Sequence, residues 1–261
     1  MCIRDRVKCA VNPVVGREAA LADAEFAASN HPRHVAIVGA GPAGLETARV
    51  AAQRGHRVTV WEAGPAIGGA LRFAGLVYEP NLALLRWYEH EMRRLAVDIR
   101  VGTPGTPERV EALGADVVVV ATGAARQRPD LPGADQRHVF DGDDLRDLLT
   151  GGGDGNACRR LGLGARLAVG TGRRLGLLRD PGTVARLSSH YMPLGDDVVV
   201  IGGGLVGVEL AEFLLERKRR VTVLEEGEKF ALEMAHPRRW RILDDLRTHG
   251  ATLVSLSLIH I

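Results

Sequence analysis

A chain of 261 residues with 34 Lys and Arg against 32 Asp and Glu has a net charge of only +2, far from the basic excess that is typical of nucleic-acid-binding proteins. Its basic residues are spread along the sequence and no apolar run approaches the ~20 residues of a membrane-spanning helix, so we expect neither a nucleic acid nor a membrane as partner. The composition, 46% hydrophobic and 25% charged, is typical of a globular protein with room for two small domains, and three cysteines without disulfide-like spacing favour the reducing cytoplasm.

The two ends of the chain carry related hexapeptides. Residues 1–6 can be encoded by ATG TGT ATA AGA GAC AG, and residues 256–261 by the reverse complement of that string. Both resemble a translated transposon-end sequencing adapter, and we leave them out of the fold prediction. The expectation is that the sequence is a fragment of a protein that continues in both directions. The alternative is an accidental complementarity of ordinary termini.

Residues 34–62 have the pattern of a β-α-β unit. An apolar strand leads into Gly39-x-Gly41-x-x-Gly44, an alanine-rich helix follows, and a second strand ends at Glu62. In such a loop Gly39 permits the tight turn, Gly41 lets a pyrophosphate approach the backbone, and Gly44 lets the helix lie close to the sheet. Glu62, 23 positions after Gly39, is then placed to accept hydrogen bonds from adenosine ribose hydroxyls. These residues predict a dinucleotide site, with a purely structural glycine turn as the alternative.

Two later segments resemble accessory motifs of the two-dinucleotide-fold flavoproteins. The first is the pair Gly68 and Gly69, just past the second strand, and the other is the strand end formed by Ala121, Thr122 and Gly123. In that class the first fold binds FAD. The resemblance implies that the glycine pair lies against the FAD pyrophosphate and that Ala-Thr-Gly marks the crossing into the NAD(P) domain. A plain loop and a buried strand end are the alternatives.

The stretch between these motifs predicts one helix and one strand. Residues 81–95 have apolar side chains at helical spacing, so we expect a helix that packs on the sheet. Trp87 and Tyr88 are expected at its core and rim rather than as a base-stacking platform, because no basic groove accompanies them. Residues 97–101 are predicted to form a short strand.

A second copy of the first motif begins at Asp197. A strand leads into Gly202-x-Gly204-x-x-Gly207, a helix follows, and the next strand ends at Glu225, again 23 positions after the first glycine. This repeat predicts a second dinucleotide fold, for NAD(P)H. A carboxylate at Glu225 accepts hydrogen bonds from the ribose hydroxyls of NADH but repels the 2'-phosphate of NADPH, so NADH is the expected coenzyme. The alternative is that a neighbouring basic side chain, Arg219, Arg220 or Lys229, lies over the ribose and reverses this preference.

The predicted fold class is therefore α/β, with two Rossmann-like dinucleotide-binding domains. Residues 34–150 are expected to be the FAD-binding domain without its closing part, and residues 196–255 the N-terminal half of a truncated NAD(P)-binding domain, with a helix near residues 238–249. Residues 151–195, rich in Gly, Arg and Leu, are expected to be an irregular or partly helical connector whose arginines form a solvated surface rather than a phosphate site.

Residues 7–33, before the first strand, narrow the resemblance further. They contain Cys9-Ala-Val-Asn-Pro-Val-Val-Gly-Arg-Glu, which resembles a junction in bacterial NADH:flavin oxidoreductases of the Old Yellow Enzyme class, of the 2,4-dienoyl-CoA reductase-like type. In that family an FMN-binding barrel and a four-cysteine 4Fe-4S site come first. The resemblance implies that Cys9 is the last cluster ligand in the parent protein. The role applies to that longer protein because one thiolate cannot hold a cluster. For this chain alone, a free cysteine is the alternative.

The resemblance implies an electron relay in the parent protein. NAD(P)H on the second fold would reduce FAD on the first, and electrons would pass through the cluster to FMN and an enoyl- or dienoyl-type alkene. The cofactors carry the redox chemistry, so no catalytic acid or base is expected in this chain, which we expect to be inactive alone. Two alternatives stay open: another two-dinucleotide-fold flavoprotein, such as the small subunit of glutamate synthase, and a module that binds an adenine nucleotide without redox turnover. The small-molecule substrate and the oligomeric state are not indicated.

Overall fold

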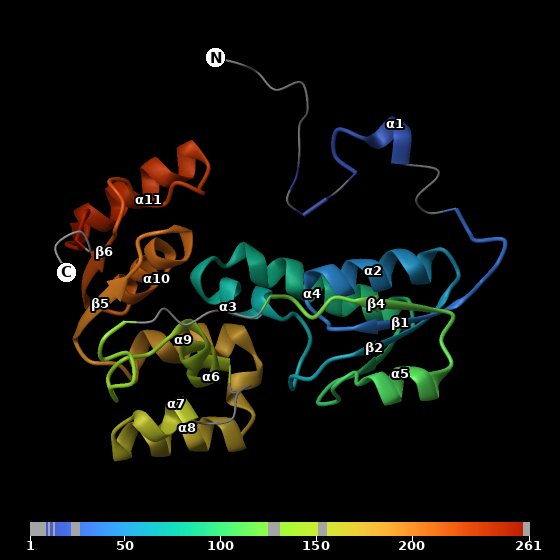
Figure 1. Cartoon of the computed structure of the whole chain (residues 1–261), viewed down its shortest axis with the longest axis horizontal. Coiled ribbons are helices and arrows are strands. Elements are labelled where there is room, and N and C mark those ends of the chain that lie inside the picture. The colour runs from blue at the N-terminus through green and yellow to red at the C-terminus, as the bar shows by residue number, and fades with distance from the viewer. Residues whose placement is uncertain are drawn as a thin grey trace. The chain divides into compact units, whose positions relative to one another are not determined.

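The structure, a computed structural model, contains two separate parallel sheets (Figure 1). It describes residues 9, 11–12, 14–21, 27–124, 131–150 and 156–257. Residues 1–6 and 258–261, which belong to the predicted adapter hexapeptides, lie outside these ranges. The chain divides into two compact units, which we call unit 1 (residues 1–74 and 80–128) and unit 2 (residues 75–79 and 129–261). The predicted α/β class with parallel, Rossmann-like sheets is confirmed, whereas the predicted domain limits stay a prediction.

Unit 1 is built on a four-stranded parallel sheet. Its strands lie in the order β3-β2-β1-β4. The elements from residue 18 to residue 120 are α1 (Glu18–Leu21), β1 (His34–Val38), α2 (Pro42–Gln53), β2 (Arg57–Trp61), α3 (Ala70–Val77), α4 (Pro80–Arg94), β3 (Asp98–Arg100), α5 (Pro107–Leu113) and β4 (Val117–Val120). In the register, Val35 of β1 pairs with Val58 of β2 and with Val117 of β4. Because β1 lies between β2 and β4, Gly39, which directly follows β1, lies between the carboxyl ends of these two strands.

Helices α2 and α4 supply the core of unit 1. Alternate residues of β1 and β2 point to one face of the sheet and pack against Leu45 of α2 and Leu85 and Met92 of α4. The predicted helix over residues 81–95 and the predicted strand over residues 97–101 are therefore confirmed as α4 and β3, and each end differs from the prediction by one residue. Within α4, Tyr88 is buried and Trp87 stays at the exposed rim.

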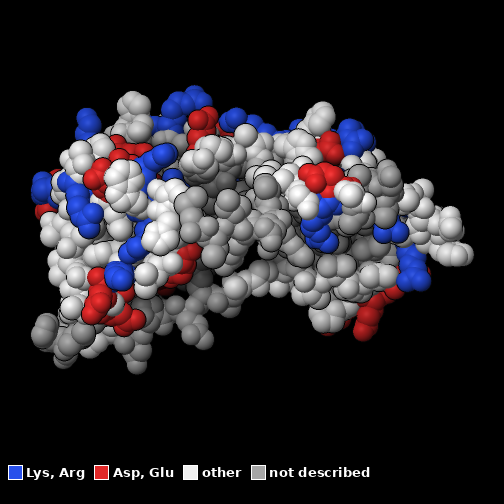
Figure 2. Space-filling model, turned by 90° about the horizontal axis from the view of Figure 1, so that it is seen from above, with Lys and Arg blue, Asp and Glu red and all other residues white. Residues whose placement is uncertain are grey.

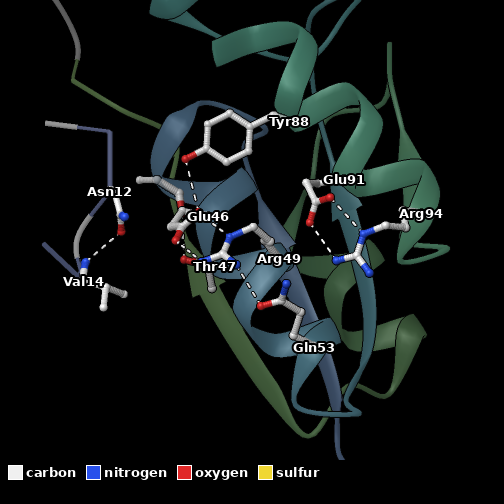
Figure 3. A network of polar contacts seen from close by, with 10 residues as sticks. Asn12, Val14, Glu46, Thr47, Arg49, Gln53, Tyr88, Glu91 and Arg94 are labelled. Atoms are coloured by element: carbon white, nitrogen blue, oxygen red, sulfur yellow. Dashed lines mark hydrogen bonds and ion pairs between the residues drawn. The ribbon is translucent and has the colours of Figure 1, made fainter. Parts of the chain in front are cut away.

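A buried polar network joins α2 to α4 (Figure 3). The guanidinium of Arg49 donates to both carboxylate oxygens of Glu46, at 2.6 and 2.8 Å, and to Oε1 of Gln53 at 2.8 Å. The hydroxyl of Tyr88 donates to Glu46 at 3.3 Å, and burial, together with the negative charge of Glu46, raises the pKa of Tyr88 to about 12. A buried arginine is tolerated when its donors are satisfied by acceptors, and here the acceptors lie on α2 itself. The bond from Tyr88 to Glu46 links α4 to this network.

Unit 2 contains a three-stranded parallel sheet in the order β5-β6-β7. Its elements are α6 (Gly142–Thr150), α7 (Asn156–Arg160), α8 (Leu163–Arg174), the 3-10 helix η1 (Leu177–Arg179), α9 (Pro181–His190), β5 (Asp197–Ile201), α10 (Leu205–Glu216), β6 (Arg220–Leu224), α11 (His236–Thr248) and β7 (Thr252–Val254). Helix α10 packs on β6 and on α11. The helix expected near residues 238–249 is therefore confirmed as α11.

Helices occupy most of the described part of the connector between the two glycine motifs. Leu148 of α6, Ala157 and Leu161 at α7, and Val169 of α8 form a small apolar core of their own. The side chain of Asp180 accepts a hydrogen bond from the Thr183 amide at 2.8 Å and so caps the N-terminus of α9. Among the described residues, no helix combines the length and apolarity needed to cross a bilayer.

Both units bring a helix into close contact with the loop that precedes it. A Cβ atom built on Gly44 of α2 would collide with the carbonyl oxygen of Gly39, and one built on Gly207 of α10 would collide with that of Gly202. Gly39 and Gly202 also have positive φ angles, +105° and +101°, which favour glycine. The third glycine of each motif is thus a packing requirement of the fold itself.

We expect Gly44→Ala to destabilise unit 1 by about 1–3 kcal/mol, because the Gly39 backbone that its Cβ meets cannot yield freely. The Gly39 amide is itself bonded to the Trp61 carbonyl at 2.8 Å. The matched control is Gly41→Ala in the same loop, where nothing lies within 4 Å of the added Cβ and the cost should stay below about 1 kcal/mol.

Urea unfolding followed by tryptophan fluorescence measures this difference. Trp61 is 2% exposed and Trp240 is 73% exposed, so the emission change on unfolding reports mainly unit 1. Equal destabilisation by the two substitutions would contradict the close-contact explanation.

Candidate functional site

The first candidate site lies at the carboxyl end of β1, where ligands bind in open parallel sheets. The predicted glycine pair is folded directly against the first glycine loop. The Gly68 amide donates to the Ala40 carbonyl at 2.7 Å, and a Cβ on Gly69 would lie 3.0 Å from the Cα of Gly41. Two motifs separated in sequence therefore form one continuous backbone surface.

The third predicted segment meets the same loop from the other side. The Ala121 amide donates to the Val38 carbonyl at 2.8 Å, and a Cβ on Gly39 would collide with the carbonyl oxygen of Ala121 and lie 3.1 Å from the Cα of Thr122. Gly123, with φ at +78°, turns the chain away from the sheet. The structure thus brings together all the residues that the sequence predicted around the first loop.

Space remains above the middle glycine of this loop. Gly41 is the N-cap residue of α2, and no side chain caps this helix. A Cβ atom added at Gly41 would have no neighbouring atom within 4 Å. The first amides of a helix have no intrahelical acceptor and lie at the positive end of the helix dipole. This end of α2 can therefore accept a phosphate group with several N–H donors.

Glu62 is held in place by the backbone on both sides of this opening. One carboxylate oxygen accepts a hydrogen bond from the Ala40 amide at 2.9 Å, and the other accepts one from the Gly64 amide at 2.7 Å. A carboxylate oxygen has two lone pairs, so each can accept a further bond from a ribose hydroxyl. The sequence analysis predicts that Glu62 contacts the ribose. It does not predict that the same carboxylate accepts a hydrogen bond from the glycine loop.

The second glycine loop repeats this arrangement in unit 2. Glu225 accepts hydrogen bonds from the Gly203 amide at 2.6 Å and the Gly227 amide at 2.9 Å. Gly204 is the N-cap of α10 and has no side-chain cap. The predicted residues Gly202, Gly204, Gly207 and Glu225 are thus brought together at the carboxyl end of β5.

The second loop differs from the first in what covers it. A Cβ on Gly203 would collide with the ring of Phe230, and the Ala231 amide donates to the Gly203 carbonyl at 2.8 Å. A Glu233 carboxylate oxygen lies 3.3 Å from the Cβ position of Gly204. Sequence reasoning did not identify this covering segment, whose signal in the sequence is the short apolar run from Phe230 to Leu232 after several charged residues.

Cys9 is exposed, and its thiol accepts hydrogen bonds from backbone amides that follow it in the chain. Hydrogen bonds from the backbone amides of Asn12 and then Val11 lower the pKa of its thiol, with the Asn12 amide 3.4 Å from Sγ. In the part of the chain that the structure describes, no group of three or more His, Cys, Asp or Glu side chains is arranged to hold a metal ion. Ligation of a cluster by Cys9 therefore stays a prediction about a longer protein.

Comparison with known proteins identifies a family and several relatives. The family profile described as pyridine nucleotide-disulphide oxidoreductase matches residues 12–106 and 33–257. The NADH oxidase of Thermoanaerobacter brockii is 30% identical over 249 residues, which are 94% of this chain and 32% of that protein. The cinnamate reductase of Clostridium sporogenes is 32% identical over 221 residues, 84% of this chain and 26% of that protein.

Among solved structures, a 2-naphthoyl-CoA reductase in complex with 2-naphthoyl-CoA superposes with a TM-score of 0.70 at 26% identity. The match covers 95% of this chain and 32% of that one. The chain thus spans about a third or less of the proteins that it resembles. With a family profile that matches most of its length, and with oxidoreductases among its relatives, the chain belongs to the pyridine nucleotide-disulphide oxidoreductase family, a family of flavin-dependent oxidoreductases.

Proposed function

We propose that unit 1 binds FAD, that the second glycine loop binds NADH, and that the chain serves the reduction of FAD by NADH. The observation that supports this most directly is the convergence of three separate segments on the open loop at Gly41. Gly68 and Gly69 pack on it from one side, and Ala121 from the other. A structural turn would need no such unfilled space above its middle glycine.

The residues of this chain would bind and orient the cofactor. The amides at the start of α2 would hold the pyrophosphate, with Gly41 and Gly69 allowing its close approach, and Glu62 would accept hydrogen bonds from the adenosine ribose. Bound FAD would supply two-electron redox chemistry, which none of these side chains can carry out. The chain therefore needs no acid or base at the first loop for its part in the reaction.

Glu225 would select the coenzyme at the second loop. Its two backbone hydrogen bonds hold the carboxylate at the end of β6, the place that an adenosine ribose occupies in this fold. A fixed negative charge there accepts the hydroxyls of NADH and repels the 2'-phosphate of NADPH. We therefore propose NADH as the preferred coenzyme.

For a longer protein we propose an alkene reductase in which electrons leave FAD toward a 4Fe-4S cluster, with Cys9 as one ligand, and then FMN. The names of the relatives support this proposal: two are called cinnamate reductase and 2-naphthoyl-CoA reductase, and both names describe reduction of an unsaturated acid derivative. An enoyl- or dienoyl-type compound is the proposed class of substrate.

The assignment of two ligands to two loops predicts a double dissociation. Gly41→Ala should lower the affinity of the chain for FAD by about tenfold or more, because the added methyl group fills the space through which the pyrophosphate approaches. Gly204→Ala, the matched change in the second loop, should leave FAD binding unchanged and weaken NADH binding by a similar factor. Equilibrium dialysis with each ligand measures both affinities. Loss of FAD binding in Gly204→Ala but not in Gly41→Ala would contradict the assignment.

The role of Glu225 predicts a change in coenzyme preference on Glu225→Gln. Glutamine keeps one acceptor for the loop amides but removes the charge, so NADPH should gain about tenfold in affinity relative to NADH. Glu226→Gln, which removes a neighbouring charge without backbone bonds to the loop, is the matched control and should leave the ratio unchanged. Titration calorimetry with both nucleotides decides the matter. Tighter binding of NADPH than NADH by the unmodified chain would show that Glu225 has another role.

A further inference from the structure

Residues 156–179 depart from the charge balance of the chain. This segment contains six arginines and no aspartate or glutamate, although the whole chain has 34 basic and 32 acidic residues. On the face of the molecule in Figure 2, by contrast, acidic and basic side chains are interspersed. The expectation of neither a nucleic acid nor a membrane as partner rests on the balance of the whole chain, whereas this segment by itself has an excess of positive charge.

Among the arginines of this segment whose side chains the structure describes, two form ion pairs with nearby carboxylates. Arg160 pairs with Asp144 at 2.8 Å, and Arg173 pairs with Asp147. Arg159, Arg166 and Arg174 form no ion pair within the part of the chain that the structure describes. Helix α8 and its flanks therefore present an uncompensated positive charge.

The same helix exposes leucines on its solvent face. Val169 faces the small core shared with α6 and α7. Leu163 and Leu167, one turn apart on the opposite face, are 77% and 71% exposed, and Leu175 at the C-cap is 68% exposed. Since Arg166 and Arg174 border the leucines, apolar and cationic side chains share one surface.

We propose that this face of α8 binds the headgroup region of an anionic lipid bilayer. Leucines that protrude singly can enter the boundary between headgroups and acyl chains, while the neighbouring guanidinium groups contact lipid phosphates and keep their charge in water. This is attachment to a membrane surface, and it requires no helix that crosses the bilayer.

The dimensions of the surface favour a bilayer over an acidic protein. A helix of 12 residues is about 18 Å long, and a stable protein interface buries about 800 Å² on each partner, more than one face of such a helix offers. A lipid surface needs no matching shape, so leucines and arginines on one short helix are enough. The charge supplies the attraction, and the leucines supply the retention at high salt.

Flotation of the purified 261-residue chain with vesicles tests the proposal, because aggregated protein stays at the bottom of the gradient. We expect the chain to float with vesicles that contain phosphatidylglycerol and to remain below with vesicles of pure phosphatidylcholine. Arg166→Gln with Arg174→Gln should lower the partition coefficient by about tenfold, and Leu163→Ser with Leu167→Ser by a similar factor.

Helix α11 of the same unit provides matched controls. Arg241→Gln with Arg247→Gln removes the same charge from two exposed positions of a helix that also carries acids, and Trp240→Ser removes a highly exposed apolar side chain. Both control variants should float like the unmodified chain, and far-UV circular dichroism should show that all variants are folded. Absence of flotation, equal flotation with both lipids, or an equal loss in the α11 variants would overturn the proposal.

Discussion

The hydrogen bonds between a strand-terminal carboxylate and the backbone of a glycine loop determine the geometry of both candidate sites. In unit 1, Glu62 joins the Ala40 amide in the loop to the Gly64 amide beyond the strand, and in unit 2 Glu225 does the same with Gly203 and Gly227. Bonds from an amide to an ionised carboxylate are stronger than neutral ones, so they hold the loop while its helix N-terminus stays open. The close approach of Gly44 and Gly207 to the preceding loop depends on that fixed shape.

The same local design leads to two different environments. The first loop is contacted by Gly68 and by Ala121, and nothing lies within 4 Å of a Cβ added at Gly41. At the second loop, the Phe230 ring lies against Gly203, and a carboxylate oxygen of Glu233 lies 3.3 Å from the Cβ position of Gly204. The two loops therefore differ in the surface that they present to a ligand, although both end at a helix N-terminus without a side-chain cap.

The elements that the sequence predicted well are those with local signals. The spacing of Gly39, Gly41 and Gly44 fixed the first β-α-β unit, and the apolar period of residues 81–95 predicted α4. The hydrogen bonds from the Ala40 amide to Glu62 and from the Gly203 amide to Glu225 could not be predicted. Each joins residues that are 22 positions apart and that meet only in the folded loop. The connector was harder for a different reason. Glycines within α8 disfavour a helix locally, and the packing of Val169 against Leu148 and Leu161 outweighs that preference.

Hydrogen–deuterium exchange with each ligand added alone tests the central claim, that the two glycine loops hold different dinucleotides. The account predicts that FAD slows exchange in the peptides that contain Gly39 to Gly44 and Gly68 to Gly69, because their amides face the pyrophosphate, and leaves the peptide with Gly202 to Gly207 unchanged. NADH should protect the peptide with Gly202 to Gly207 and leave the first loop unchanged. Protection of the second loop by FAD, or of the first loop alone by NADH, would contradict the account.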